Sequence, residues 1–360
     1  MKKISLGLIA LLSVFLIVAQ VQCRSSEPKQ EEVKQIIFLI GDGMGLAQFH
    51  AAMQHSERPL QLERAQVVGL QKTYSATHKV TDSAASGTAL ATGTKTYNGA
   101  IGVGPDSVAR VVSVLEKAAE KGLSTGLIAT YRITHATPAA FIGHVNDRNK
   151  EEQIAADFLE TDITFFAGGG RNQFEVRKDG RNLSSELTDK GYQLVYTLDE
   201  LRSVNDGKVA GLLADSHLPK MREGRGDFLP VATGKALEVL SRNDKGFFIM
   251  IEGSMIDGGG HDNDIQMIVD ETFDFDKAVG LAFDFADRNP GTLVVVTADH
   301  ETGGLTPAEG SRDSLAYRFS TGGHTGVMVP VYAYGAGAER FSGIMENTDI
   351  PKRMMELLGL

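Results

Sequence analysis

Continuous apolar runs recur along the chain at intervals too long for hairpins. Five of these runs predict buried β-strands: Gln35–Ile40, Ser124–Thr130, Phe247–Ile251, Leu293–Thr297 and Val327–Tyr334. Between them, apolar residues recur with helical spacing, for instance over Val108–Lys121 and Ile265–Asp287. Such alternation of strands and helices predicts an α/β three-layer sandwich, with a mainly parallel central sheet and helices on both faces.

The first 23 residues have the order of a secretory signal peptide. Lys2 and Lys3 precede an apolar run over residues 6–18, which is shorter than the roughly 20 residues of a membrane-spanning helix. A buried first strand or helix is the alternative, and the two leading lysines disfavour it. Cys23 would suit a lipoprotein, but Gln22 fits lipoprotein processing poorly. We therefore favour simple cleavage near Cys23 and export to the periplasm or the medium, with no transmembrane helix in the mature chain.

The mature chain is acidic and has no cysteine. Removal of residues 1–23 takes away two lysines and changes the formal net charge from −10 to −12, with no cluster of basic residues to offset it. This balance disfavours nucleic-acid binding through a basic face. Because Cys23 is the only cysteine, a metal site in the mature protein must use oxygen and nitrogen ligands. Residues 24–34 are polar and predict a short tether, and 35–360 shows no internal linker and predicts one domain.

Acidic residues and histidines follow three of the predicted strands at their carboxyl ends. Asp42 follows the first, the stretch from Glu252 to His261 follows the third, and Asp299 and His300 follow the fourth. In parallel sheets, ligands bind beyond the carboxyl ends of the strands. Asp, Glu and His are typical zinc ligands, so their convergence predicts a metal centre at this edge.

The stretch TDSAASGTALATG, residues 81–93, consists almost entirely of small residues. A flexible linker is one interpretation. The alternative is a helix that begins at Ser83 and directs free N–H groups at an anion. Thr81 and Asp82 ahead of the serine, and the Ala/Leu spacing after it, favour the helix.

Six motifs, in order, resemble those of the alkaline phosphatases, in particular the bacterial secreted type. They are IGDGMG, TDSAASGTALATG, THATPAAFIGHVNDR, FFIMIEGSMIDGGGH, TADHETGG and GGHTG, and the similarity covers essentially all of residues 35–360. The resemblance implies an alkaline-phosphatase-like fold and a single catalytic domain. It also implies metal-dependent hydrolysis of small phosphate monoesters through a phosphoserine intermediate, two zinc ions and one magnesium ion per chain, and a homodimer.

The same resemblance assigns roles to individual residues. Ser83 would be the nucleophile, and Arg148 would clamp two phosphoryl oxygens. The metal ligands would be Asp42, Asp299 and His300 for one zinc ion, Asp257, His261 and His324 for the other, and Asp42, Thr137 and Glu252 for magnesium. The small residues around Ser83 would let phosphate and two metal ions approach it.

The sequence departs from the family pattern at two positions near this expected site. His135 stands next to the magnesium site, where some bacterial members have Asp, and Gly258 stands where a Lys or His often reaches toward phosphate. A phosphodiesterase of the same superfamily and a non-catalytic phosphate- or metal-binding protein are the alternative functions. Ser83, Arg148, Thr137 and Glu252 favour the monoesterase. We interpret the remaining histidines as structural or solvent-facing: His50, His55, His78, His144 and His217.

Overall fold

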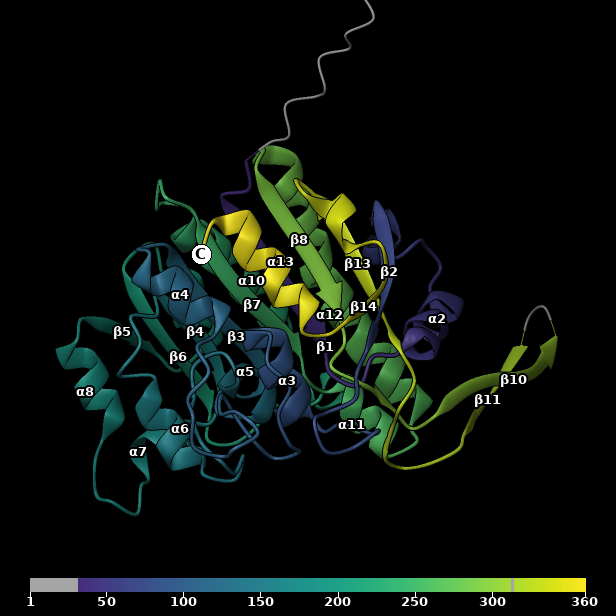
Figure 1. The fold of residues 1–360 in the computed structure, drawn as a ribbon, viewed down its shortest axis with the longest axis horizontal. Helices are drawn as coiled ribbons and strands as arrows, with labels where there is room; N and C mark the ends of the chain where they lie inside the picture. Colours follow the sequence, from purple (N-terminus) through teal and green to yellow (C-terminus); the bar gives the residue numbers. More distant parts are fainter. Residues whose placement is uncertain (1–31, 312–313) are drawn as a thin grey trace, which may run out of the picture. The chain divides into compact units, whose positions relative to one another are not determined.

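A ten-stranded, mainly parallel sheet forms the centre of the protein, here described from a computed structural model that covers residues 32–311 and 314–360 (Figure 1). Every neighbouring pair is parallel except the two made by β13, which is antiparallel to both its neighbours. In order across the sheet the strands are β14 (Gly343–Glu346), β2 (Val67–Lys72), β13 (Val329–Gly335), β8 (Thr292–Thr297), β1 (Gln35–Gly41), β7 (Phe247–Gly253), β3 (Ser124–Arg132), β4 (Phe165–Gly169), β6 (Lys208–Ala214) and β5 (Tyr192–Val195).

Helices cover both faces of this sheet. One face packs against α3 (Ser83–Thr92), α4 (Val114–Glu120), α5 (Ala136–Ala139), α6 (Glu151–Asp157), α7 (Arg171–Glu175), α8 (Leu183–Asp189) and α13 (Asp349–Leu358). The other face packs against α2 (Leu46–His55), α9 (Leu198–Ser203), α10 (Phe228–Leu240), α11 (Ile256–His261) and α12 (Ile265–Arg288). The predicted three-layer α/β sandwich is confirmed.

Strand β1 is apolar without interruption because both of its faces are buried. Ile36, Phe38 and Ile40 belong to the core on one side of the sheet, and Ile37 and Leu39 belong to the core on the other. A strand buried on both faces has no solvent-facing position, so it loses the alternation typical of a surface strand.

Several short elements complete the fold. A two-stranded hairpin of β10 (Leu305–Ser311) and β11 (Ser314–Phe319) extends away from the central sheet (Figure 1). Two-residue strands β9 (Glu301–Thr302) and β12 (His324–Thr325) pair with each other at the base of that hairpin. The 3₁₀ turns are η1 (Gln61–Arg64), η2 (Met221–Glu223) and η3 (Ala338–Phe341).

All five predicted strands are present, and the predicted helix over Ile265–Asp287 is α12. The helix predicted over Val108–Lys121 is too long, because α4 begins only at Val114. Ser113 and Glu116 form a reciprocal capping box at this point: the Ser113 hydroxyl accepts from the Glu116 N–H, and the Glu116 carboxylate accepts from the Ser113 N–H. Such a box marks the first turn of a helix, so the residues before it lie outside α4.

The described chain begins within the predicted tether. The expected signal peptide over 1–23, with Cys23, lies outside the described residues, as does most of 24–34. Val33, at the end of that segment, is buried in the core, and the Lys34 N–H donates to the Gly291 carbonyl at 2.9 Å. These last tether residues are therefore part of the folded unit. Within residues 32–311 and 314–360, no helix combines the length and hydrophobicity needed to cross a bilayer.

The sheet brings the chemically distinctive residues to one edge. Strands β8, β1, β7 and β3 are consecutive, and Ile40 lies in register with both Glu252 on β7 and Thr297 on β8. Asp42 lies two residues after Ile40, and Asp299 lies two residues after Thr297. The carboxyl ends of these central strands thus deliver the predicted ligands to one place, as expected for an open parallel sheet.

Candidate active site

The deepest cluster of polar side chains consists of Asp42, Asp299 and His300, which we call the inner group. All three residues are fully buried. His300 Nε2 lies 3.2 Å from Asp299 Oδ2 and 3.6 Å from Asp42 Oδ1. Both Asp42 oxygens and Asp299 Oδ2 lack a hydrogen-bond partner among the described residues. Buried, unsatisfied carboxylate oxygens are costly, so this donor set fits a cation, and its mix of carboxylate and imidazole fits zinc.

Ionisation in the inner group reflects the crowding of negative charge. Burial, and then the charge of Asp299, raises the pKa of Asp42 well above its usual range. For Asp299, burial acts in the same direction, but the charge of His300 together with hydrogen bonds from His300 and the Gly43 N–H outweighs burial and lowers the pKa. A divalent cation among these carboxylates would favour the ionised form of each.

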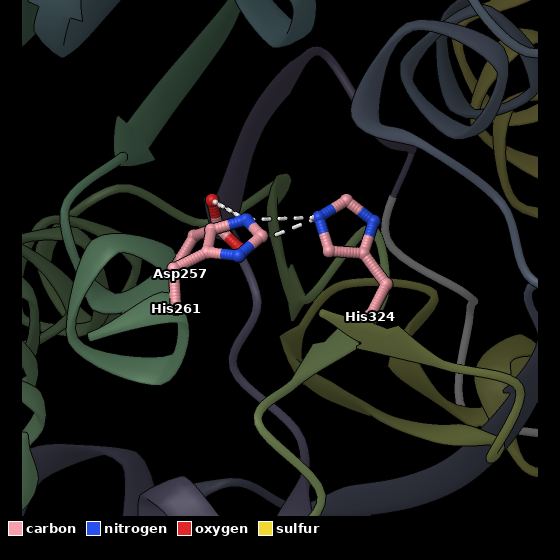
Figure 2. A group of neighbouring side chains, drawn as sticks. All are labelled: Asp257, His261 and His324. Carbon is pink, nitrogen blue, oxygen red and sulfur yellow. Dashed lines mark hydrogen bonds and ion pairs between the residues drawn. The ribbon is translucent and has the colours of Figure 1, made fainter. Parts of the chain in front are cut away.

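A second cluster, the outer group, consists of Asp257, His261 and His324. Asp257 and His261 lie one turn apart on α11, and His324 lies on β12. His261 Nε2 is 3.3 Å from Asp257 Oδ2 and 3.2 Å from His324 Nε2, and Figure 2 shows the two rings with these nitrogens facing each other. The donor atoms converge closely enough to hold one ion.

The opposite ring nitrogens of the outer histidines are anchored to backbone carbonyls. His261 Nδ1 donates to the Gly322 carbonyl at 2.7 Å, and His324 Nδ1 donates to the Thr81 carbonyl at 2.9 Å. A histidine that donates from one nitrogen presents the lone pair of the other, which is the usual arrangement of a metal-binding imidazole. The outer group therefore also fits a zinc ion.

The three consecutive glycines between Asp257 and His261 have a packing role. A Cβ on Gly259 would lie 2.8 Å from the Ile268 nitrogen, and a Cβ on Gly260 would lie 2.7 Å from the Thr302 carbonyl oxygen. Both contacts are with backbone that cannot move aside. Gly259 and Gly260 thus let α11 approach α12 and β9.

A third cluster combines Asp42 with Glu252 and His135, next to Thr137. One ligand atom from each of Asp42, Glu252 and His135 lies within 4.8 Å of the others. Glu252 Oε1, Thr137 Oγ1 and His135 Nδ1 are buried without a hydrogen-bond partner among the described residues. Burial raises the pKa of Glu252 to about 8. The structure thus places an imidazole directly among the carboxylates, closer than the neighbouring position expected from the sequence.

Ser83 lies at the N-terminus of α3, as the sequence predicted. Its Oγ is 3.1 Å from His300 Nε2 of the inner group. Asp82 caps the helix by accepting from the Ala85 N–H at 3.0 Å, and its second oxygen accepts from Arg148 at 3.2 Å. The sequence indicated Asp82 only as support for the helix and did not link it to Arg148. One carboxylate thus fixes both the first turn of the helix and the guanidinium.

The small residues after Ser83 are entirely buried in α3. A Cβ on Gly87 would lie 3.1 Å from Ala140 Cβ at the end of α5, and the Ser86 hydroxyl donates to the Asp299 carbonyl at 2.6 Å. The flexible-linker interpretation is therefore wrong. Most of the run packs the helix closely against its neighbours, and only its N-terminus faces the polar clusters.

Two further residues near the site were not identified from the sequence. Thr302 donates to Asp257 Oδ1 at 2.5 Å and lies 3.2 Å from His300 Nδ1, so it contacts both groups. His217, interpreted as structural or solvent-facing, packs against Tyr131 in a tilted arrangement with ring centroids 4.0 Å apart, and its ring centre is 5.9 Å from that of His135. Thr302 belongs to the polar run TADHETGG, which also contains predicted metal ligands, so this run could have indicated Thr302. His217 follows β6 in a stretch that contains no such motif.

With this geometry in view, the family model described as alkaline phosphatase matches residues 33–318 and 311–360. The chain belongs to the alkaline phosphatase family. Alkaline phosphatase 3 of Bacillus subtilis is 35% identical over 91% of this chain and 90% of its own length. The alkaline phosphatase of Escherichia coli is 32% identical over 91% of this chain and 86% of its own length.

Solved structures agree with this assignment. The alkaline phosphatase of the Antarctic bacterium TAB5 is 43% identical, with a TM-score of 0.88 over 92% of this chain and 99% of that one. A variant of the TAB5 enzyme in which aspartate replaces a histidine was solved with Mg bound in its M3 site. The predicted family and fold are confirmed, and this alkaline phosphatase is an enzyme that hydrolyses phosphate monoesters.

Proposed function

We propose that this alkaline phosphatase catalyses hydrolysis with Ser83 as the nucleophile and Arg148 as the phosphate clamp. The observation that carries the proposal is the position of Ser83 Oγ, 3.1 Å from His300 Nε2 and at the start of a ten-residue helix. A phosphoryl group at this point would meet free N–H groups of the helix and the guanidinium of Arg148. Asp82 orients both, since it caps the helix and accepts from Arg148.

We further propose that the inner and outer groups each hold one zinc ion, and that Asp42, Glu252 and Thr137 hold one magnesium ion. The zinc assignments rest on the mixed carboxylate and imidazole donors, and the magnesium assignment rests on the oxygen donors that this hard ion prefers. Bound divalent ions would stabilise charge on the entering and leaving oxygens and lower the pKa of the attacking group.

The residues then act in two displacements at phosphorus. Ser83 Oγ loses its proton and attacks, the bond from phosphorus to the leaving alcohol oxygen breaks, and phosphoserine forms. Water attacks the phosphoserine from the vacated side, which releases inorganic phosphate and regenerates Ser83. Arg148 holds two phosphoryl oxygens through both steps, because its planar fork matches their geometry. A covalent intermediate divides one difficult displacement into two easier ones.

The wider organisation of the protein is also part of the proposal. We infer that residues 1–23 are a signal peptide, that 24–34 connect it to a single catalytic domain over 35–360, and that the mature enzyme is periplasmic or secreted. Lys2, Lys3 and the apolar run after them support export. A homodimer rests on family resemblance alone, and sedimentation of the purified chain would test it.

The decisive experiment combines metal analysis with trapping of the intermediate. The mature enzyme should contain two zinc ions and one magnesium ion per chain and should hydrolyse p-nitrophenyl phosphate. Mass spectrometry of acid-quenched enzyme should locate phosphate on Ser83. Phosphate on another residue would contradict the nucleophile assignment. Faster turnover of bis(p-nitrophenyl) phosphate would favour a phosphodiesterase, and metal content without any turnover would favour a binding protein.

A second experiment addresses His135 in the third cluster. An imidazole adds no negative charge and accepts zinc, so His135 should weaken the preference of the third cluster for magnesium. His135→Asp should move the magnesium activation midpoint to a lower concentration, by about tenfold if the new carboxylate binds the ion directly. His50→Asp, which adds the same charge at an exposed position, is the matched control. An unchanged or higher midpoint in His135→Asp would show that this position does not tune the site. In the TAB5 enzyme, a variant with aspartate in place of a histidine holds Mg in its M3 site, so such a replacement is compatible with bound magnesium there.

A further inference from the structure

Tyr131, near the end of β3, contacts His135 of the third cluster and lies next to Gly258 on α11, but it belongs to none of the proposed catalytic parts. Its ring meets the edge of His135 with centroids 5.0 Å apart and packs on His217. Its backbone N–H donates to the Ser254 hydroxyl at 3.2 Å, and that hydroxyl donates to Glu252 Oε2 at 2.7 Å. The position of Tyr131 is thus linked to the third cluster through its own backbone.

The Tyr131 hydroxyl points toward the helix that carries the outer group. A Cβ built on Gly258, the residue after Asp257, would lie 3.1 Å from Tyr131 Oη and 2.9 Å from Met267 Cε. Gly258 lies within the helix α11 and has no positive φ, so its backbone does not require glycine. The absent side chain instead leaves the space that the hydroxyl occupies.

No hydrogen bond joins the Tyr131 hydroxyl to any residue within 32–311 and 314–360, although the ring is half-buried. The hydroxyl is not fully buried, so a ligand bound in the site could reach it. Burial, and then the charges of Asp257 and Asp42, raise the pKa of Tyr131, so the phenol lies close to these proposed metal ligands.

Two contacts indicate where a ligand of the Tyr131 hydroxyl would lie. Arg148, the proposed clamp, lies 3.2 Å from His135 Nε2, and Tyr131 packs on the same imidazole ring. On its other side the hydroxyl lies next to Gly258 and thus to the outer group. The space between the outer group and Arg148 is where the proposed function holds the phosphoryl group.

We propose that Tyr131 is a phosphate-binding residue whose hydroxyl donates a hydrogen bond to an oxygen of the bound phosphoryl group. A neutral donor holds the anion without adding charge, and Gly258 permits its approach. His217 holds the ring in place, because it packs against the phenol at a tilt of 40° and is itself held by Arg132 at 2.9 Å. This inference rests on the catalytic site proposed above.

Competitive inhibition by inorganic phosphate tests the inference directly. Tyr131→Phe keeps the ring and removes only the donor, so the inhibition constant for phosphate and the KM for p-nitrophenyl phosphate should each rise about fivefold. Zinc content and the melting temperature without phosphate should stay at wild-type values. Tyr192→Phe is the matched control, because the Tyr192 hydroxyl donates to the Ile163 carbonyl far from the site; its phosphate affinity should not change.

A double-mutant cycle with Gly258→Ala makes the inference independent of one variant. The added methyl group should push the hydroxyl away and raise the phosphate inhibition constant in the wild-type background, but should have little effect when residue 131 is Phe. Additive effects, or a Tyr131→Phe inhibition constant within twofold of wild type, would overturn the role of Tyr131 while leaving the proposed function standing. If metal-loaded wild-type enzyme binds no phosphate, the proposed function fails and this inference fails with it.

Discussion

The inner and outer groups use similar donors but are built differently. The inner residues follow two central strands and are fully buried, so the hydrogen-bond ladder of the sheet fixes their positions. The outer residues come from a six-residue helix and a two-residue strand, and the His261 side chain is 43% exposed. If the two groups hold the proposed ions, the sheet would fix one ion beside Ser83 at the start of α3, whereas solvent and substrate would reach the other ion.

Contacts between the two groups limit their independence. His300 and His324 stack with ring centroids 3.6 Å apart, and Thr302 contacts His300 and Asp257. A change in one group should therefore be felt in the other, although their exposure to solvent differs. Perturbations that act on one group alone are the way to separate their roles.

The largest effect should come from replacing Ser83, which lies beside the inner group. Ser83→Ala should reduce the turnover of p-nitrophenyl phosphate by about 10³-fold or more while both zinc ions remain bound, because a nucleophile is lost and no proposed metal ligand is changed. Thr92→Ala removes a hydroxyl at the far end of the same helix and should keep near-wild-type turnover. Steady-state kinetics with zinc analysis checks both variants. Near-wild-type turnover in Ser83→Ala would mean that another group attacks phosphorus.

The inner group is also the part that the sequence predicted best. Asp42, Asp299 and His300 directly follow apolar runs that cannot be anything but buried strands, so the edge of a parallel sheet brings them together by topology alone. The start of a helix at Ser83 was predicted because a small-residue run with an acid before it favours a capped helix, whereas the role of Ser83 came from the family resemblance. These signals are local, and the sheet then supplies the long-range order.

The remaining features depend on contacts that no local pattern encodes. His217 packs against Tyr131 from a loop after β6, and nothing in the spacing of either residue indicates the pairing. Gly258 could be read only as a missing side chain until Tyr131 was seen to fill its space. The overlong helix before Lys121 is different, because the capping box at Ser113 was visible in the sequence and was not used.

A smaller effect should come from Arg148, which contacts Asp82 and His135 rather than the inner or outer group. Arg148→Ala should lower kcat/KM by about 10²-fold or less and weaken phosphate inhibition, since one bidentate contact is lost. Arg148→Lys should lie between wild type and Ala, because it keeps the charge and loses the planar fork. Unchanged phosphate affinity in both variants, measured by competitive inhibition, would exclude the clamp.

Metal removal should separate the two groups by their exposure. Because His261 faces solvent and His300 does not, a chelator should remove the outer ion at an about tenfold lower concentration than the inner one. Zinc content measured along a chelator series should therefore fall in two steps. His261→Gln should lack the first step and keep the second. A single step that removes both ions together would show that the contacts through Thr302 and the stacked histidines dominate.

The smallest expected effect is the pH dependence of the outer group. In the metal-free protein the hydrogen bond with Asp257 raises the pKa of His261 to about 9, whereas burial lowers the pKa of His324. Since the folded pKa of His261 lies above its unfolded value of about 6.5, the protonated form stabilises the metal-free fold fully below about pH 6.5, and this stabilisation is lost as the pH rises through 9. Zinc must displace the same proton, so zinc affinity at the outer group should rise with pH by at most about tenfold per unit and level off above pH 9.

Two measurements check this pH dependence. Zinc titrations against a competing chelator at several pH values give the affinity, and NMR titration of the metal-free protein gives the pKa of His261 directly. Asp257→Asn, which removes the partner carboxylate, should return His261 toward its ordinary pKa, and the spectrum of His261→Gln identifies the signal. If His261 of the wild-type protein titrates near its ordinary pKa, this prediction is wrong. Zinc would then bind the outer group without competition from a proton that Asp257 stabilises on His261.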